Sequence, residues 1–102
     1  PRRDAYGENR RTERYRGRQM EEKYFTYILK SEEHQKYYYG HTKDLAKRLQ
    51  THNRGRVRST KAFRPWVLHY CESFETKSEA YRRELFFKSI DGYNFLRRNN
   101  II

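Results

Sequence analysis

The 102-residue sequence has few cysteines and no long apolar run, and each scarcity excludes a class of protein. The one cysteine, Cys71, cannot form an internal disulfide and has no Cys or His neighbour at zinc-finger spacing. No apolar run approaches the roughly 20 residues that cross a bilayer. No charged-then-apolar leader opens the chain, so secretion is not expected. These absences predict a cytoplasmic protein in a reducing setting, with no membrane partner.

Acidic residues are too few to balance the basic ones. The 13 Asp and Glu face 24 Lys and Arg, which leaves a net charge of +11. The excess is concentrated, because residues 43–64 carry eight Lys and Arg against Asp44 alone. A segment of one sign favours a polyanionic partner, with nucleic acid as the first candidate. The alternative is a solvated, arginine-rich loop with no partner.

Residues 1–19 differ in composition from the rest of the chain. They hold seven Arg against three acids and almost no aliphatic side chains. We interpret them as a flexible basic extension, native or not, and residues 20–102 as one domain. The ten Tyr, six Phe and one Trp argue against wholesale disorder and supply much of a small core.

Aromatic and β-branched residues predict three strands. Residues 24–29 and 36–42 favour strands on either side of a polar turn, so they are expected to form a hairpin. Residues 66–74 predict the third strand. With the helices described next, the order is β-β-α-β-α-α. The fold class is therefore a small α+β domain with a three-stranded antiparallel sheet and flanking helices.

The helices are expected from their capping residues. Thr42 can cap a helix over about 43–54. The sequence that starts at Thr76 has the form of a capping box, so a second helix begins there. Gly92 is expected to break it, before a short last helix over 93–98.

Three polar side chains fall at apolar angles on these helices. Arg48 and His52 are neighbours one turn apart, on the edge of the buried face. Glu84 lies inside an apolar arc that reaches Leu85. Because a buried carboxylate rarely lacks a partner, a divalent cation or an arginine is expected beside Glu84. The alternative is an ordinary i, i+4 ion pair with Lys88.

The predicted hairpin is rich in tyrosine. Three consecutive residues, 37–39, place phenols on both faces of the sheet, and Tyr27 on the neighbouring strand adds another. Aromatic core packing explains most of them. Gly40 follows directly, and a glycine weakens a strand unless another group must approach the backbone there.

These motifs, in this order, resemble the GIY-YIG endonuclease superfamily from about residue 24 to 98. The likeness is narrower to small stand-alone bacterial members related to the nuclease domain of the excision-repair nuclease subunit. The two family tripeptides would fall on Phe25-Thr26-Tyr27 and Tyr38-Tyr39-Gly40, with ten residues between Tyr27 and Tyr38. The departures at Phe25, Thr26 and Tyr39 fall on strand-packing positions. The remaining motifs are Lys43-Asp44-Leu45, Arg48-Leu49, His52-Asn53, Arg64-Pro65-Trp66 and Arg83-Glu84.

The resemblance implies a metal-dependent endonuclease that hydrolyses phosphodiester bonds in DNA, with branched or damaged DNA as candidate substrates. Glu84 would bind Mg²⁺ or Mn²⁺, and Arg48 would be the catalytic arginine. Tyr27 would act as the base or position the water, with Tyr38 and His52 orienting it, although these three roles can be exchanged. Arg48, a metal or a hydrogen bond to His52 would be expected to lower the pKa of Tyr27.

The same reading gives the residues expected to contact nucleic acid. The loop from Arg54 to Arg64 would grip the backbone, with two hydroxyls as extra phosphate donors. The full set is Gly40, His41, Lys43, Lys47, Asn53, Arg54, Arg56, Arg58, Ser59, Thr60, Lys61 and Arg64. A binding module of the same fold that cleaves weakly or not at all is the alternative, and an RNA-associated protein is a third. A partner protein or a homodimer stays open for so small a domain.

Overall fold

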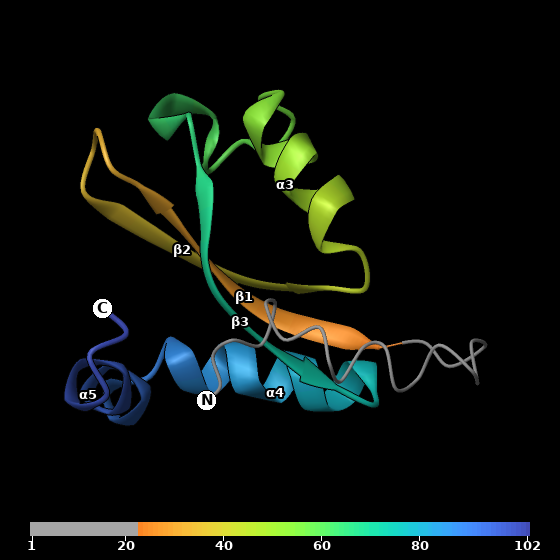
Figure 1. Ribbon diagram of the computed structural model, residues 1–102, viewed down its shortest axis with the longest axis vertical. Helices are drawn as coiled ribbons and strands as arrows, with labels where there is room; N and C mark the ends of the chain where they lie inside the picture. Colours follow the sequence, from red (N-terminus) through yellow and green to blue (C-terminus); the bar gives the residue numbers. More distant parts are fainter. Residues whose placement is uncertain (1–22) are drawn as a thin grey trace.

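The computed structural model describes residues 23–102, so the predicted basic extension over 1–19 lies outside the described residues. The described chain forms a three-stranded sheet with helices on both faces (Figure 1). This confirms the α+β class and the order β-β-α-β-α-α, with one short 3-10 turn added in the basic segment. The elements are β1 (Tyr24–Ser31), β2 (Lys36–Thr42), α3 (Leu45–Asn53), η2 (Lys61–Phe63), β3 (Val67–Phe74), α4 (Lys77–Phe87) and α5 (Ile90–Arg98).

The sheet has the order β2-β1-β3, and both pairings are antiparallel. Strand β1 is central, which explains why four consecutive residues, 26–29, are buried on both of its faces. Tyr27 lies opposite Gly40 of β2 on one side and Cys71 of β3 on the other. Strand β2 is left at the edge, so groups from both faces can meet along it.

Side-chain alternation along β1 divides the core into two clusters. Helix α3 packs on the face that carries Tyr27 and Leu29, together with Trp66. Helices α4 and α5 cover the opposite face, where Ile28 packs with Phe87 and other apolar side chains (Figure 1). No helix among the described residues is long and apolar enough to cross a bilayer.

The start of α3 corrects one prediction. Asp44, not Thr42, caps the helix, because its side chain accepts the backbone N–H of Lys47 at 3.0 Å. The Thr42 hydroxyl instead accepts the N–H of Asp44 at 3.1 Å, which fixes the turn before the helix. Thr76 caps α4 as predicted, with Glu79 completing the capping box.

Gly92 does not break the second helix, which was the expectation. Helix α4 ends at Phe87, and Ser89 caps α5 by accepting the N–H of Gly92 at 3.0 Å. Gly92 therefore lies inside α5. A Cβ there would stand 1.7 Å from the carbonyl oxygen of Phe86, so the glycine is needed for the close approach of the two helices.

The buried face of α4 is narrower than the sequence arc. Ala80, Glu84 and Phe87 are buried, whereas Tyr81 and Leu85 are 47% and 46% exposed. The Thr26 hydroxyl donates to the carbonyl of Ala80 at 2.7 Å, which holds this side of α4 on β1. Glu84 is consequently turned toward the sheet, and Leu85 away from it.

Candidate active site

Tyr27 is the centre of a polar cluster under α3. Its side chain is 1% exposed, and its ring crosses β2 directly over Gly40. A Cβ on Gly40 would stand 2.5 Å from the Tyr27 hydroxyl oxygen and 2.6 Å from Cζ. Gly40 is buried, and the close approach of the phenol is the reason for a glycine in this strand.

Helix α3 brings two polar side chains to the Tyr27 hydroxyl. His52 Nε2 lies 3.1 Å from it, and Arg48 Nε donates to it at 3.4 Å. The ring of Tyr38 packs on this group, with its centroid 4.8 Å from that of His52 and 6.3 Å from that of Tyr27. Four of the five residues expected to be catalytic therefore lie together.

The electrostatics of this cluster differ from the expectation. Burial raises the pKa of Tyr27 to about 12, and the hydrogen bond from Arg48 opposes this only in part. Tyr27 thus keeps its proton at neutral pH. Burial, followed by the charge of Arg48, lowers the pKa of His52 to about 4, so the imidazole is neutral. The hydrogen bond to Tyr27 raises the pKa of Arg48, which stays charged.

Glu84 is 8% exposed and is held by two side chains. Its Oε1 lies 2.6 Å from His41 Nδ1, and its Oε2 accepts from Lys88 Nζ at 2.6 Å. The i, i+4 pair that the sequence allowed is therefore present. His41, which was expected to contact nucleic acid, orients this carboxylate, and its side chain stays 24% exposed.

Glu84 approaches from the opposite face of the sheet. Tyr27 packs on Gly40 from the α3 side, and Glu84 binds His41, the next residue of β2, from the α4 side. The charge of Glu84 reaches far enough to raise the pKa of Tyr27 slightly. The two parts of the expected site thus meet at neighbouring residues of the edge strand.

Glu84 fits a metal site that has one carboxylate ligand. Among residues 23–102, no three His, Cys, Asp or Glu side chains gather as a ligand set. Mg²⁺ is often bound through one or two carboxylates, with water and substrate phosphates completing its shell. Each oxygen of Glu84 has a second lone pair beyond its present bond. The Lys88 side chain is 48% exposed, so it can move into solvent in exchange for a cation.

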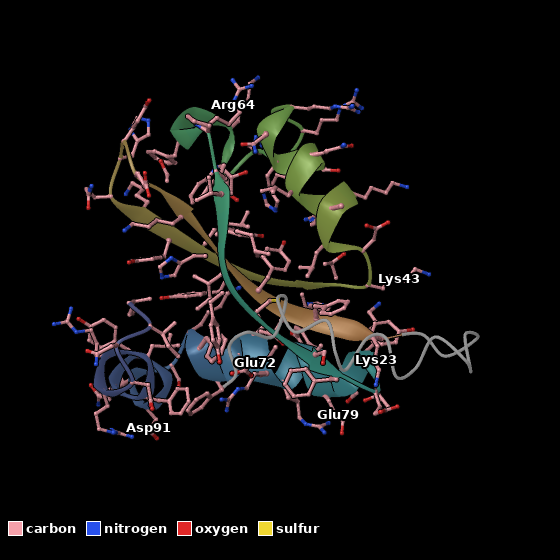
Figure 2. All side chains as sticks on the ribbon, viewed as in Figure 1. Lys23, Lys43, Arg64, Glu72, Glu79 and Asp91 are labelled. Atoms are coloured by element: carbon pink, nitrogen blue, oxygen red, sulfur yellow. The ribbon has the colours of Figure 1, made fainter. Side chains whose placement is uncertain are left out.

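The expected nucleic-acid contacts divide into exposed and structural groups. The exposed group is Lys43, Lys47, Arg54, Arg56, Arg58, Ser59, Lys61 and Arg64. Figure 2 places Arg64 and Lys43 on the α3 side of the molecule, and Glu72, Glu79 and Asp91 on the α4 and α5 side. All eight exposed residues of this group belong to residues 43–64, which form α3 and the segment that joins it to β3.

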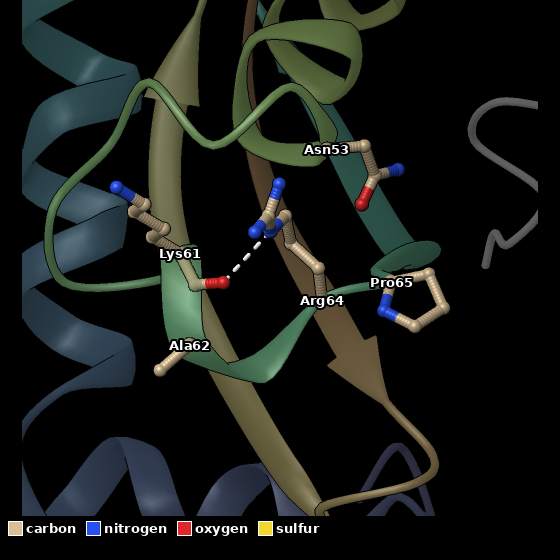
Figure 3. A pocket seen from close by; sticks show the side chains of 5 residues that line it. All are labelled: Asn53, Lys61, Ala62, Arg64 and Pro65. Carbon is tan, nitrogen blue, oxygen red and sulfur yellow. Dashed lines mark hydrogen bonds between the residues drawn. The ribbon is translucent and has the colours of Figure 1, made fainter.

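Two exposed cations of this group border a surface cavity of about 350 Å³, which Asn53, Lys61, Ala62, Arg64 and Pro65 line (Figure 3). Arg64 Nε donates to the carbonyl of Lys61 at 2.8 Å, which holds the guanidinium at the rim. A Cβ on Gly55 would stand 2.8 Å from an Arg64 terminal nitrogen, so the glycine leaves room for it.

Two of the expected contact residues support the loop from inside. The Asn53 amide bonds the backbone of Trp66 twice, at 2.9 Å through Nδ2 and at 2.7 Å through Oδ1. Thr60 is 1% exposed, and its hydroxyl lies 2.9 Å from His52 Nδ1. The prediction that Thr60 binds phosphate is therefore wrong, because its hydroxyl is buried against the site. The contact between Thr60 and His52 could not be predicted, because Thr60 lies in a loop and no periodicity in the sequence relates the two positions.

The comparison with known proteins adds a family to this geometry. Residues 23–93 match the model of the GIY-YIG catalytic domain. UPF0213 protein YazA of Bacillus subtilis is 43% identical over 68 residues, which cover 66% of this chain and 68% of that protein. A UPF0213 protein of Bacillus velezensis is 46% identical over 68 residues, with the same coverage. One of Listeria welshimeri is 40% identical over 72 residues, or 70% of this chain and 79% of that protein.

No solved structure matches the chain. The family model nevertheless spans both hairpin strands, the α3 helix and Glu84. Its match covers well over half of the sequence and includes every residue of the cluster around Tyr27. The chain therefore belongs to the GIY-YIG family.

Proposed function

We propose that this chain is a metal-dependent endonuclease that hydrolyses phosphodiester bonds in DNA, with branched or damaged DNA as preferred substrates. One observation carries the proposal: Arg48 and His52 converge on the Tyr27 hydroxyl, and Glu84 meets the adjoining residue of β2. Phosphodiester hydrolysis needs a positioned water, positive charge at the phosphate and stabilisation of the leaving oxygen. This cluster contains a group for each task.

Tyr27 positions the attacking water. With a pKa of about 12 it is not an ionised base at neutral pH, so its task is to hold water by a hydrogen bond. Tyr38 packs on the rings of Tyr27 and His52 and limits their movement.

Arg48 supplies the charge at the phosphate. Its guanidinium is a planar fork that suits phosphate oxygens and keeps its proton at any relevant pH. One of its donors already binds Tyr27, so a phosphate on the fork would lie next to the water that Tyr27 holds. The fork therefore couples substrate position to nucleophile position.

Glu84 would hold the divalent ion, with His41 fixing the orientation of its carboxylate. A bound Mg²⁺ or Mn²⁺ supplies Lewis-acid polarisation of the phosphate and stabilisation of the leaving oxygen. The exposed cations of residues 43–64 would bind the DNA backbone without reading its sequence.

The first test is cleavage by Glu84→Gln. Supercoiled plasmid and a set of branched DNAs are incubated with wild type and variant in Mg²⁺ or Mn²⁺. We expect wild type to cleave and Glu84→Gln to lose at least roughly 100-fold in rate, on the order of what loss of a metal ligand or key electrostatic group costs. Binding of the same DNA should be unchanged, because the basic segment is intact.

The matched control is Glu33→Gln, an equal change of charge in the exposed turn between β1 and β2. It should cleave like wild type. Equal rates for wild type and Glu84→Gln would remove Glu84 from the reaction. Tight DNA binding by wild type without cleavage in either metal would instead support a binding module, in which the pairs with His41 and Lys88 have a purely structural role.

A further inference from the structure

The buried face of the site contains a hydroxyl that the reaction described above does not use. Thr60 follows the exposed arginines of the basic segment but is itself 1% exposed. Its Oγ1 lies 2.9 Å from His52 Nδ1 and 3.3 Å from the carbonyl oxygen of Val57. Trp66 Nε1 donates to the Thr60 carbonyl at 2.9 Å, which anchors the residue under α3. His52 is thus bonded at both ring nitrogens, by Tyr27 and by Thr60.

The positions of the protons follow from what each neighbour can accept. His52 is neutral, so only one of its nitrogens has a hydrogen. If that nitrogen were Nε2, both His52 and Arg48 would donate to Tyr27, and the phenolic proton would have no recorded acceptor within residues 23–102. Because Tyr27 is 1% exposed, neither protein nor solvent would pair this hydroxyl, which is unfavourable for a buried polar group.

Protonation at Nδ1 satisfies every group. The Tyr27 hydroxyl then donates to Nε2, Nδ1 donates to Thr60, and the Thr60 hydroxyl donates to the Val57 carbonyl. That carbonyl also accepts the backbone N–H groups of Thr60 and Lys61, so it does not depend on the hydroxyl for a partner. The buried phenol needs an acceptor for its proton, so Nε2 of His52 must be unprotonated. Thr60 permits this tautomer because its hydroxyl accepts the hydrogen of Nδ1.

We propose that Thr60 is a positioning residue, which holds His52 in the Nδ1-protonated form so that Nε2 accepts the phenolic proton of Tyr27. The consequence lies at the Tyr27 oxygen. Arg48 occupies one of its lone pairs, which leaves the remaining lone pair as an acceptor. In the Nε2-protonated tautomer, both lone pairs of the Tyr27 oxygen would accept hydrogen bonds, from His52 and Arg48. Tyr27 could then bind another group only as a donor.

This difference decides how Tyr27 binds a nucleophilic water, and this step rests on the proposed nuclease function. A water that attacks phosphorus must donate a hydrogen to its holder and keep an oxygen lone pair for the phosphate. Tyr27 provides such an acceptor only while His52 takes its proton. Thr60 thereby acts on the reaction through His52 and Tyr27, without touching substrate.

The direct test is the tautomer of His52. Protein with ¹⁵N-labelled histidine is measured by long-range ¹H–¹⁵N correlation at pH 7, as wild type, Thr60→Val, Thr60→Ser and Thr51→Val. We expect a protonated Nδ1 and a bare Nε2 in wild type and Thr60→Ser, and a shift toward protonated Nε2 in Thr60→Val. Thr51→Val is the matched control, since it removes a hydroxyl that bonds only the Lys47 carbonyl on the surface of α3; it should retain the wild-type pattern.

A wild-type spectrum with protonated Nε2 would overturn the inference, and so would a Thr60→Val spectrum identical to wild type. This readout needs no substrate, so it holds even if the protein does not cleave DNA. If Thr60→Val does not fold, wild type and Thr60→Ser still decide, because both must show protonated Nδ1.

Cleavage then tests the consequence. In single-turnover assays, Thr60→Val should slow the reaction by about 10- to 100-fold, comparable with the loss of an outer partner of a functional histidine. DNA affinity should not change, and Thr60→Ser should restore most of the rate. An altered tautomer with an unaltered cleavage rate would refute the positioning role, while absence of cleavage by wild type would refute the nuclease function alone.

Discussion

The two faces of the sheet are built differently. Under α3, the buried groups include the polar side chains of His52 and Thr60 and the hydroxyl of Tyr27, all joined by hydrogen bonds. Under α4 and α5, Ile28, Phe87 and Leu96 pack with surrounding aromatic rings, and the buried Thr26 and Glu84 bond to separate partners. A buried polar network contributes little net stability, whereas apolar burial contributes about 25 cal/mol for each Å². Both faces bury apolar side chains, but the α3 face adds a connected polar network that is suited to chemistry.

Charge follows the same division. Residues 43–64 carry eight Lys and Arg against one acid, while residues 65–102 carry six against five. On the α4 side some charges form ion pairs, as between Arg83 and Glu72 at 2.8 Å. Glu84 is the exception, because it is the one expected catalytic group that the apolar layer provides. It reaches the site because β2 is an edge strand.

The division predicts that the largest loss of stability follows truncation in the apolar layer. Phe87→Ala should lower the free energy of unfolding by about 3–5 kcal/mol, since it empties a fully buried site. Cleavage per folded molecule should change little. Chemical denaturation combined with a plasmid assay on the folded fraction measures both quantities.

Leu85→Ala is the matched control on the same helix. Leu85 is 46% exposed, so its truncation should cost less than about 1 kcal/mol. Similar losses for Phe87 and Leu85 would mean that α4 packs along the wider face that the sequence arc predicted.

The apolar arc of α4 illustrates how much of the fold could be predicted from the sequence. Strand alternation, the capping box at Thr76 and the burial of Glu84 were all predicted, because each depends on local spacing. The width of the buried face was not, since it depends on where α4 meets β1. Gly92 shows the same limit. The sequence contains the glycine, but only the structure shows that it lies against the backbone of Phe86, where a Cβ would not fit.

The candidate site shows this limit more strongly. Helical geometry placed Arg48 and His52 together, and the resemblance to the GIY-YIG superfamily added Tyr27 to them. The raised pKa of Tyr27 was not predicted, because it depends on complete burial under α3. Thr60 was assigned to phosphate because its neighbours are basic and exposed, yet the loop turns it inward to His52.

The second test of the difference between the two faces is the pH dependence of stability, which should come in part from His52 under α3. The pKa of His52 is about 4 in the folded protein and near 6.5 when unperturbed, so the unfolded chain takes up a proton first as pH falls. Stability from the neutral, buried ring is present above pH 6.5 and is lost as pH falls toward 4. The loss should be on the order of 3 kcal/mol.

The measurement is the free energy of unfolding from pH 7.5 to 4, in wild type, His52→Gln and His34→Gln. His34 lies in the exposed turn between β1 and β2, so its variant should show the wild-type decrease. His52→Gln should lack the part of the decrease between pH 6.5 and 4. The difference between variants removes the contribution of carboxylates, which titrate in all three proteins. The same decrease in His52→Gln as in wild type would show that the α3 layer is not the pH-sensitive one.

The last prediction compares removal of three arginines from the α3 layer with removal of three from the α4 and α5 layer. Arg54, Arg56 and Arg58 are exposed in the basic segment, and their combined replacement by Ala should weaken DNA binding. Each phosphate contact contributes about 0.9 to the slope of log affinity against log salt, so the slope should shrink by up to about 3. Stability should change little, because the three side chains lie on the surface.

The control removes equal charge from the other layer. Arg82, Arg97 and Arg98 are exposed on α4 and α5, and their triple Ala variant has the same net charge as the first. If the affinity for DNA depends only on net charge, both variants lose affinity equally, and the two layers do not differ in DNA binding. If the α3 layer is the DNA-binding face, the control keeps nearly the wild-type salt slope. Fluorescence anisotropy with one labelled duplex at several salt concentrations separates these outcomes, because net charge is identical and only its position differs.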